Sequence, residues 1–317
     1  MLLLVTNRRD ITMDYVVAEL HRRGQPYMRL NTELLPKALC TMAGYPRDAW
    51  SISLDGETVC GEEVTGAYFR RPGAPIISDD VSDEGERAYI GAEWSSFLKS
   101  LYSRLDGRWL NSPTKIFIAE DKPMQLLLAH EIGFDVPQVA VTNDIKSVRS
   151  ITANGQAVGK PLRQAVLTGD IERVMFTTRL GSINDGHADA IALTPFITQA
   201  EVVKQYDVRV TVVGERVFAT AIWSQNNPET EVDWRQGSRP DLQHERIELT
   251  ESVQEKCVEL VRRLGLRYGA IDLVRDKAGK LWFLEINPNG QWAWIENLTG
   301  YPIASAIVDE LMVGCCV

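Results

Sequence analysis

Apolar residues recur along the chain at two spacings, which predict strands and helices in alternation. Leu2–Thr6 and Pro26–Asn31 are short apolar runs that predict strands. The segment between them has a helical apolar stripe and ends at Gly24, which suits the left-handed position after a helix. The stripe consists of Met13, Val16, Val17 and Leu20. The chain therefore opens with the order β-α-β.

The same spacings continue through the rest of the chain and predict an α/β fold. Apolar runs bounded by turn residues predict strands and hairpins at residues 50–64, 67–71, 139–142, 156–160 and 207–222. Segments with an apolar stripe at helical spacing predict helices at residues 83–104, 122–133, 250–265 and 303–312. Residues 110–113, Leu-Asn-Ser-Pro, interrupt the pattern and predict a domain boundary.

Residues 268–289 predict a hairpin whose two apolar strands flank a turn at Asp276–Gly279. A loop centred near residues 278–279 puts Asp272 opposite Glu285, and Asn287 then points to the same face as Glu285. Opposed carboxylates repel, so a cation is expected between them, and oxygen ligands of this kind favour Mg²⁺. The alternative is a chance pairing of carboxylates on a solvent-exposed hairpin of an acidic chain.

Composition narrows the possible partners. The chain has 317 residues with 44% hydrophobic and 24% charged residues, ordinary values for a globular protein of two or three domains. Its net charge of −9 argues against nucleic acid as a general partner. We find no signal sequence and no apolar run near the ~20 residues of a membrane span, which predicts a cytoplasmic protein without membrane contact. The five cysteines form no CxxC pair, so a disulfide framework or zinc site is not expected.

The motif GAIDL, followed by FLEINPNGQWAWIENLTG, resembles the metal-binding end of the ATP-grasp ligases. The GQWAWIE version is closest to the microviridin-type peptide maturases, also called graspetide or ω-ester peptide ligases. The resemblance implies that Asp272, Glu285 and Asn287 bind Mg²⁺. It also implies an ATP-grasp fold with an amino-terminal pre-ATP-grasp α/β domain at 1–112, a central subdomain at 113–197 and a carboxy-terminal subdomain with the Mg site at 198–317.

The resemblance extends to the nucleotide site. It implies that Lys122, at the start of a helix, and Lys160, at a strand end, face the phosphates of ATP. Residues 155–161 approach a P-loop but are one residue short and lack the Ser or Thr for Mg²⁺, so a P-loop is excluded. Thr168-Gly169-Asp170 stands where the family has a loop that closes over the phosphates. The residues implied for the hinge around adenine are Gln199, Ala200 and Val202, and Asp207 is assigned to the same nucleotide site.

Lys160 and two arginines are candidates for catalysis, and the resemblance implies that Lys160 and Arg209 absorb the charge of the transferred phosphoryl group. The resemblance to the family's D/E-x-R motif implies that Arg209 stabilises the transferred phosphate, because a guanidinium matches spreading oxyanion charge. The alternative is a cross-strand ion pair with Glu215 or Glu229. Arg235, in the Asp-Trp-Arg part of the polar segment 226–238, is the candidate for steering a substrate carboxylate. The Arg70-Arg71 pair is interpreted as solvated surface. The alternative, implied by the resemblance to a similar Arg-Arg-Pro in the maturases, is a role in gripping an acidic peptide.

The resemblance implies an enzyme that uses ATP and Mg²⁺ to join Asp or Glu side chains to Thr, Ser or Lys through an acylphosphate. Its substrate would be a ribosomally made precursor peptide with a leader and an acidic, Thr-rich core, which becomes a macrocycle, and a homodimer is expected. One alternative is an ATP-grasp ligase that adds a free amino acid to a peptide or protein terminus. Another is a non-catalytic protein that binds nucleotide and leader peptide.

Overall fold

The structure, a computed structural model, describes residues 1–163, 166–167, 173–226, 229–235 and 241–313. The chain forms two compact units. Unit 1 comprises Met1–Ile116, Gly265–Tyr268 and Asn289–Val317, and unit 2 comprises Phe117–Leu264 and Gly269–Pro288. The short helix α3 (Pro113–Ala119) contains the first point along the sequence where the chain passes from one unit to the other. The predicted three-part division of the chain stays a prediction.

Unit 1 begins with the predicted β-α-β arrangement. Strand β1 (Leu2–Thr6) pairs in parallel with β2 (Tyr27–Asn31) on one side and with β6 (Gly66–Phe69) on the other. Helix α1 (Ile11–Arg23) connects β1 to β2 and ends at Gly24, whose φ of 64° is left-handed. The apolar runs and the helical stripe were therefore assigned correctly.

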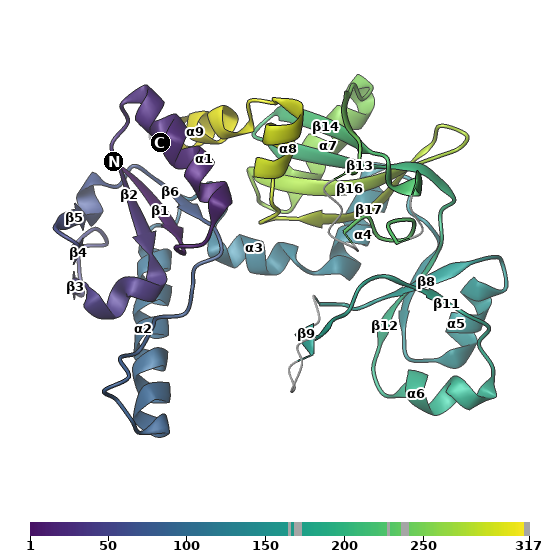
Figure 1. Ribbon diagram of the computed structural model, residues 1–317, viewed down its shortest axis with the longest axis horizontal. Coiled ribbons are helices and arrows are strands. Elements are labelled where there is room, and N and C mark those ends of the chain that lie inside the picture. Colours follow the sequence, from purple (N-terminus) through teal and green to yellow (C-terminus); the bar gives the residue numbers. More distant parts are fainter. Residues whose placement is uncertain (164–165, 168–172, 227–228, 236–240, 314–317) are drawn as a thin grey trace. The chain divides into compact units, whose positions relative to one another are not determined.

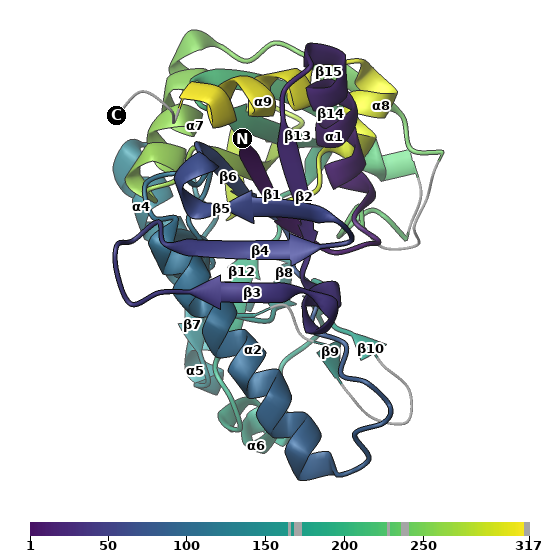
Figure 2. The same ribbon diagram turned by 90° about the vertical axis from the view of Figure 1, so that its left-hand side faces the viewer.

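A second, antiparallel sheet of unit 1 contains β3 (Leu39–Met42), β4 (Trp50–Leu54) and β5 (Glu57–Cys60), with helix α2 (Glu84–Arg104) nearby (Figure 2). The hairpin β4–β5 and helix α2 were predicted, whereas β3 was not. Buried side chains from both sheets and from α2 form one hydrophobic core, which includes Leu3, Leu30, Ile52, Leu98 and Leu101.

The carboxy-terminal helices α8 (Ala293–Thr299) and α9 (Ile303–Val313) also belong to unit 1, where both pack against α1. Helix α9 was predicted and α8 was not. Short 3₁₀ helices lie at Thr32–Lys37, Gly61–Glu63, Asp185–His187 and Ser224–Asn226. Among the described helices, none has both the length and the hydropathy needed to cross a membrane.

Unit 2 contains an antiparallel four-stranded sheet in the order β11 (Thr178–Leu180), β8 (Ala157–Lys160), β12 (Phe196–Ala200) and β7 (Val139–Thr142). Helix α5 (Ile145–Thr152) packs on β7 and β12, and α6 (Ala188–Ala192) packs on α5. Two short strands, β9 (Val166–Leu167) and β10 (Arg173–Val174), form a separate ladder. This sheet carries Lys160 and the hinge residues Gln199 and Ala200, while Val202 follows the end of β12.

The second sheet of unit 2 has five strands. Figure 1 shows most of this sheet together with helix α7. Their order is β15 (His244–Ile247), β14 (Arg216–Ile222), β13 (Lys204–Val213), β16 (Tyr268–Asp276) and β17 (Leu281–Asn287). Helix α4 (Lys122–Ile132) packs against β17, and α7 (Glu251–Arg263) packs against β13, β14 and α4. The apolar stripe of α7 is buried at Cys257, Leu260 and Val261, as its spacing predicts.

The hairpin β16–β17 brings the two predicted carboxylates together through a bulge. Asp272 pairs with Glu285, but nearer the turn Leu273 pairs with Phe283. Leu284 is therefore an extra residue on β17, which is the definition of a β-bulge. If the register nearer the turn continued without the bulge, Asp272 would pair with Leu284 instead of Glu285. The predicted pairing is right, but it depends on an irregularity that was not predicted.

Candidate active site

Three neighbouring strands of unit 2 carry the centre of the site. Asp272 lies on β16 and Glu285 lies opposite it on β17, while Asn287 is two residues further along β17 and shares the face of Glu285. The Nη1 atom of Arg209, on β13, donates to both carboxylate oxygens of Asp272 at 2.9 and 3.0 Å. The predicted metal ligand and the predicted phosphate-stabilising arginine are thus ion-paired. Arg209 and Asp272 are both buried, with exposures of 6% and 8%.

Two further cations hold the carboxylate of Glu285. The Nζ atom of Lys122, at the start of α4, lies 3.2 Å from one oxygen, and Nη1 of Arg235 lies 3.1 Å from the other. Burial alone would raise the pKa of Glu285, but the nearby charges of Lys122, Arg235 and Lys160 outweigh it and lower the pKa to about 2. Glu285 is therefore a carboxylate at neutral pH.

Lys160 is the last residue of β8 and is half-buried. Burial lowers the pKa of its ammonium to about 8; the charge of Glu285 acts in the opposite direction, and those of Lys122 and Arg235 add to the lowering. Within the described part of the chain the ammonium makes no hydrogen bond or ion pair. A cation held beside others in this way favours an anionic ligand such as phosphate.

Arg235 is positioned by its own loop. Its Nε and Nη2 atoms donate to the two oxygens of Asp233 at 2.8 and 3.0 Å, a fork that leaves Nη1 directed at Glu285. Burial raises the pKa of Asp233, but the bonds from Arg235 more than reverse this and leave the pKa below its usual value. The loop residue Asp233 was not assigned a role from the sequence.

The start of this loop is tied to β13 by a buried lysine that the sequence did not indicate. The Nζ atom of Lys204 donates to both oxygens of Asp207 at 2.8 Å and to the Val232 carbonyl at 3.3 Å. Ser224 also donates to Asp207, and burial raises the pKa of this carboxyl despite these partners. The structure thus gives Asp207 internal partners, and its contact with nucleotide stays a prediction.

The predicted hinge lies at the end of β12. Gln199 is buried, and Ala200 and Val202 are half-buried. The Ala200 N–H donates to the Gln138 carbonyl at 2.8 Å, whereas the Val202 N–H has no backbone partner among the described residues. An available N–H is what backbone recognition of adenine requires. Thr168-Gly169-Asp170, predicted to close over the phosphates, lies outside the described residues, as do residues 227–228 and 236–238 of the polar segment.

The donor set fits a hard cation. Asp272, Glu285 and Asn287 offer oxygen ligands from one face of the hairpin, and few protein ligands are typical of Mg²⁺ shared with phosphates. Among the described residues, no group of three or more His, Cys, Asp or Glu side chains is placed to hold a metal. The predicted set contains two carboxylates and an amide, so it is consistent with that finding.

A family model described as the RimK-like ATP-grasp domain matches residues 119–311. The chain belongs to the RimK-like ATP-grasp family. The ATP-grasp fold predicted from the sequence is confirmed, both by this match and by solved structures of similar fold.

Solved structures cover nearly all of this ATP-grasp chain. The macrocyclase MdnC from Microcystis aeruginosa MRC, bound with precursor peptide MdnA, matches it with a TM-score of 0.84 and 27% identity over 99% of each chain. A RiPP-associated ATP-grasp ligase from Chryseobacterium gregarium, in complex with ADP and a leader and core peptide, has a TM-score of 0.87 and 24% identity. The match covers 98% of this chain and 96% of the ligase, and it shows a similar fold. The resemblance to peptide maturases is confirmed by these likenesses.

Curated relatives match a smaller part of the ATP-grasp chain. A probable alpha-L-glutamate ligase from Pasteurella multocida (strain Pm70) is 27% identical over 214 residues, which are 64% of this chain and 63% of the relative. The chain spans between one third and two thirds of the length of the first curated relatives that it matches.

The double arginine of the ATP-grasp chain lies in unit 1, and its interpretation as solvated surface is wrong for Arg70, which is fully buried. Its Nε atom lies 3.1 Å from Asp10 Oδ2, and its Nη1 atom donates to the Gly290 carbonyl at 3.0 Å. An opposite charge and a carbonyl offset much of the cost of burying this charge, while its Nη2 atom has no hydrogen-bond partner among the described residues. Arg71 is exposed, as expected.

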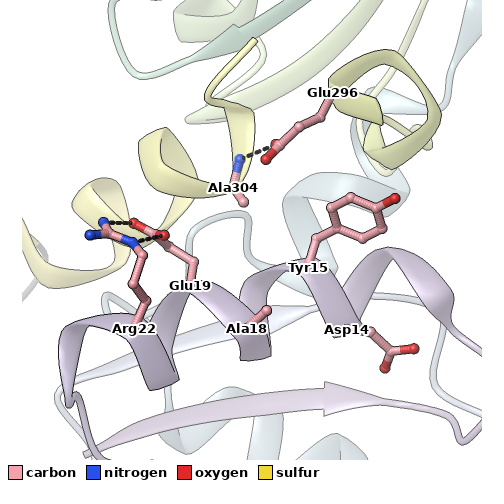
Figure 3. A pocket seen from close by; sticks show the side chains of 7 residues that line it. All are labelled: Asp14, Tyr15, Ala18, Glu19, Arg22, Glu296 and Ala304. Carbon is pink, nitrogen blue, oxygen red and sulfur yellow. Dashed lines mark hydrogen bonds and ion pairs between the residues drawn. The ribbon is translucent and has the colours of Figure 1, made fainter. Parts of the chain in front are cut away.

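Unit 1 of the ATP-grasp chain also has a pocket of about 390 Å³ between α1 and the α8–α9 segment (Figure 3). In this view Glu19 is turned toward Arg22, and Glu296 toward the backbone N–H of Ala304, from which it accepts a hydrogen bond at 2.7 Å. Its lining includes none of the predicted site residues. Both carboxylates are therefore engaged, Glu19 within α1 and Glu296 between α8 and the start of α9.

Proposed function

We propose that the chain is an ATP-dependent peptide ligase that forms side-chain ester or amide bonds within a ribosomally made precursor peptide. One observation carries the proposal: Lys122, Lys160, Arg209 and Arg235 surround the opposed carboxylates Asp272 and Glu285. The four cationic side chains suit the phosphates of ATP, and the two carboxylates beside them suit a metal ion. The likeness to MdnC over 99% of each chain supports a peptide as the substrate.

Each predicted nucleotide residue receives one role in this proposal. Lys122 and Lys160 bind phosphate oxygens, and Arg209 stabilises the phosphoryl group during transfer. The hinge residues Gln199, Ala200 and Val202, with Asp207, hold the nucleoside. The carboxylate of Asp207 already binds Lys204 and Ser224. Asp207 therefore contributes to nucleoside binding by fixing the position of β13.

Asp272, Glu285 and Asn287 would hold Mg²⁺. When bound, the ion supplies positive charge that offsets the charge of the phosphates. Arg209 and Arg235 each contact a proposed ligand, so these side chains hold the two carboxylates toward one face.

The reaction follows from the charges in the site. A carboxylate oxygen of a substrate Asp or Glu attacks the γ-phosphorus of ATP, the bond to the β-phosphate oxygen breaks, and ADP leaves. Arg235 steers the substrate carboxylate toward the cluster. A Thr or Ser hydroxyl, or a Lys amine, then attacks the acyl carbon and loses its proton as inorganic phosphate leaves. The product is an ester or amide, and exclusion of water protects the acylphosphate.

The proposed partner is a precursor peptide with a leader and an acidic, Thr-rich core. The core supplies the carboxylates and hydroxyls that the reaction consumes. A homodimer and a cytoplasmic location stay predictions from the sequence.

A second candidate is an ATP-grasp ligase that adds a free amino acid to a peptide or protein terminus. The similarity to relatives described as probable alpha-L-glutamate ligases favours it. Both candidates use an acylphosphate, so they differ in the nucleophile and in the position of the new bond.

Hydroxylamine trapping tests the proposal. The chain is incubated with ATP, Mg²⁺, a candidate precursor peptide and hydroxylamine, which intercepts an acylphosphate. We expect ADP and phosphate as products, and a hydroxamate on an Asp or Glu side chain of the peptide. A hydroxamate confined to the peptide's terminal carboxyl would support the second candidate. Formation of AMP and pyrophosphate would refute the acylphosphate route.

A further inference from the structure

Gln125 is a buried polar residue of α4, 2% exposed, and its side chain reaches β17. Its Oε1 atom accepts a hydrogen bond from the Ile286 N–H at 3.0 Å, and its Nε2 atom donates to the Ile286 carbonyl at 2.8 Å. Nε2 also donates to the Ala119 carbonyl at 2.6 Å. One side-chain amide therefore satisfies both backbone groups of a single strand residue.

The need for this contact arises from the position of β17. Among the described residues it is the last strand of its sheet. Its outer side is bridged by Asp135 near the turn, at Trp282, but no strand lies beside the outer N–H and C=O groups of Ile286. Buried backbone groups without a partner are destabilising. Among side chains only Asn and Gln carry a donor and an acceptor in the arrangement of a peptide group. Gln125 thus replaces the missing strand at Ile286.

Ile286 lies between Glu285 and Asn287. Successive side chains of a strand leave the backbone in directions fixed by its pleat, so holding Ile286 fixes where both neighbours point. Lys122 is three residues before Gln125, on the same face of α4, and binds the Glu285 carboxylate at 3.2 Å. The first turn of α4 therefore contacts β17 at two places, the backbone of Ile286 and the carboxylate of Glu285.

We infer that Gln125 is a positioning residue for the Mg²⁺ site, holding the backbone between Glu285 and Asn287 so that both side-chain oxygens face one cation. This inference rests on the proposed function, because that function makes these two residues metal ligands. Residues that hold metal ligands in position without touching the metal typically change the metal affinity 10- to 100-fold when they are mutated.

The test compares Gln125→Met and Gln125→Asn in the full chain. Met has similar length without hydrogen-bonding atoms, and Asn keeps the amide but is one methylene too short to reach Ile286. Gln254→Met is the matched control, since Gln254 of α7 donates to the Leu249 carbonyl at 2.8 Å, outside the site described above. Mn²⁺ binding in the presence of ADP, followed by electron paramagnetic resonance, reports on the metal site, and ADP binding without metal reports on the nucleotide site.

We expect both Gln125 variants to bind Mn²⁺ about 10- to 100-fold more weakly than the unchanged chain. Metal-free ADP binding should stay the same, and hydrogen exchange at residues 281–289 should be faster. Gln254→Met should match the unchanged chain in all three measurements. If Gln125→Met does not fold, the Asn variant gives the same comparison.

Wild-type Mn²⁺ affinity in a folded Gln125 variant would overturn the inference, whether or not exchange becomes faster. Glu285→Gln separates this failure from that of the proposed function. If the unchanged chain binds no Mn²⁺ with ADP, or if Glu285→Gln binds it equally well, the metal assignment fails and the Gln125 inference fails with it. If Glu285→Gln loses Mn²⁺ and the Gln125 variants keep it, only the role of Gln125 is refuted.

Discussion

Glu285→Gln is the substitution whose effect can be worked out most directly. It removes one negative charge that lies 3.2 Å from the Lys122 ammonium and 3.1 Å from the Arg235 guanidinium. Gln has nearly the shape of a protonated Glu. The stability lost on substitution at neutral pH should therefore equal the difference between the free energies of protonating Glu285 in the folded and in the unfolded chain.

The pKa of Glu285 gives that energy. The surrounding cations lower the pKa from 4.5 to about 2, and each unit corresponds to about 1.4 kcal/mol, so the variant should lose about 3 kcal/mol. Because the folded pKa lies below the unfolded one, this contribution is complete above about pH 4.5 and disappears as the pH falls toward 2. A domain with typical stability of about 5–15 kcal/mol remains folded after such a loss.

Urea unfolding at pH 7 and at several values below pH 4.5 measures both the size and the pH dependence. We expect a gap between the two proteins that is largest at neutral pH and narrows in acid. Glu259→Gln is a suitable control, because Glu259 forms a solvent-exposed pair with Arg262 within one helix. Equal stability at pH 7, or a gap that does not change with pH, would refute the electrostatic account of Glu285.

The same variant tests the chemistry. Losing a metal ligand should remove several kcal/mol of transition-state stabilisation, so Mg²⁺-dependent ATP turnover should fall on the order of 10²- to 10³-fold. A folded variant that consumes ATP at the original rate would contradict the assignment of Glu285 to the metal.

Further predictions concern buried charges. Lys160, with a pKa of about 8, carries its charge below that pH and loses it above, so calorimetry should show metal-free ATP binding weakening between pH 7 and pH 9. The same pH dependence in Lys160→Met would contradict this. Arg70→Met leaves Asp10 buried without its counter-ion and should cost about 3–5 kcal/mol in urea unfolding; an unchanged midpoint would refute the pairing. Asp207→Asn should cost a similar amount by isolating the Lys204 ammonium. Adding Lys204→Met should recover part of that loss, whereas strictly additive losses would show that the two side chains are not coupled.

Periodicity made much of the fold predictable. Apolar runs and apolar stripes at helical spacing indicate directly which residues are buried. The elements β1, α1, the β13–β14 hairpin and α7 were therefore predicted from the sequence. Strand β3 was missed because Leu39, its first residue, is 79% exposed and gives no apolar alternation. Helix α8 was missed because seven residues are too few to establish a helical period.

The site was predictable only in part, because sequence spacing does not show which distant side chains meet. The pairing of Asp272 with Glu285 follows from a local hairpin, although the bulge at Leu284 sets its final register. The burial of Arg70 depends on Asp10, 60 residues earlier in the chain. The contact of Gln125 with Ile286 spans 161 residues and involves backbone groups, which leave no signal in the sequence. Only the position of Gln125 on the buried side of a predicted helix could have suggested a special role.

The most direct test of the central claim is the intact mass of a short acidic, Thr-rich candidate precursor peptide after incubation with the chain, ATP and Mg²⁺. The account predicts the loss of one water mass per linkage, absent without ATP and absent with Glu285→Gln. Fragmentation should then place each bond between an Asp or Glu side chain and a Thr, Ser or Lys side chain. A peptide that gains the mass of an amino acid residue, or that is unchanged while ATP is consumed, would contradict the claim.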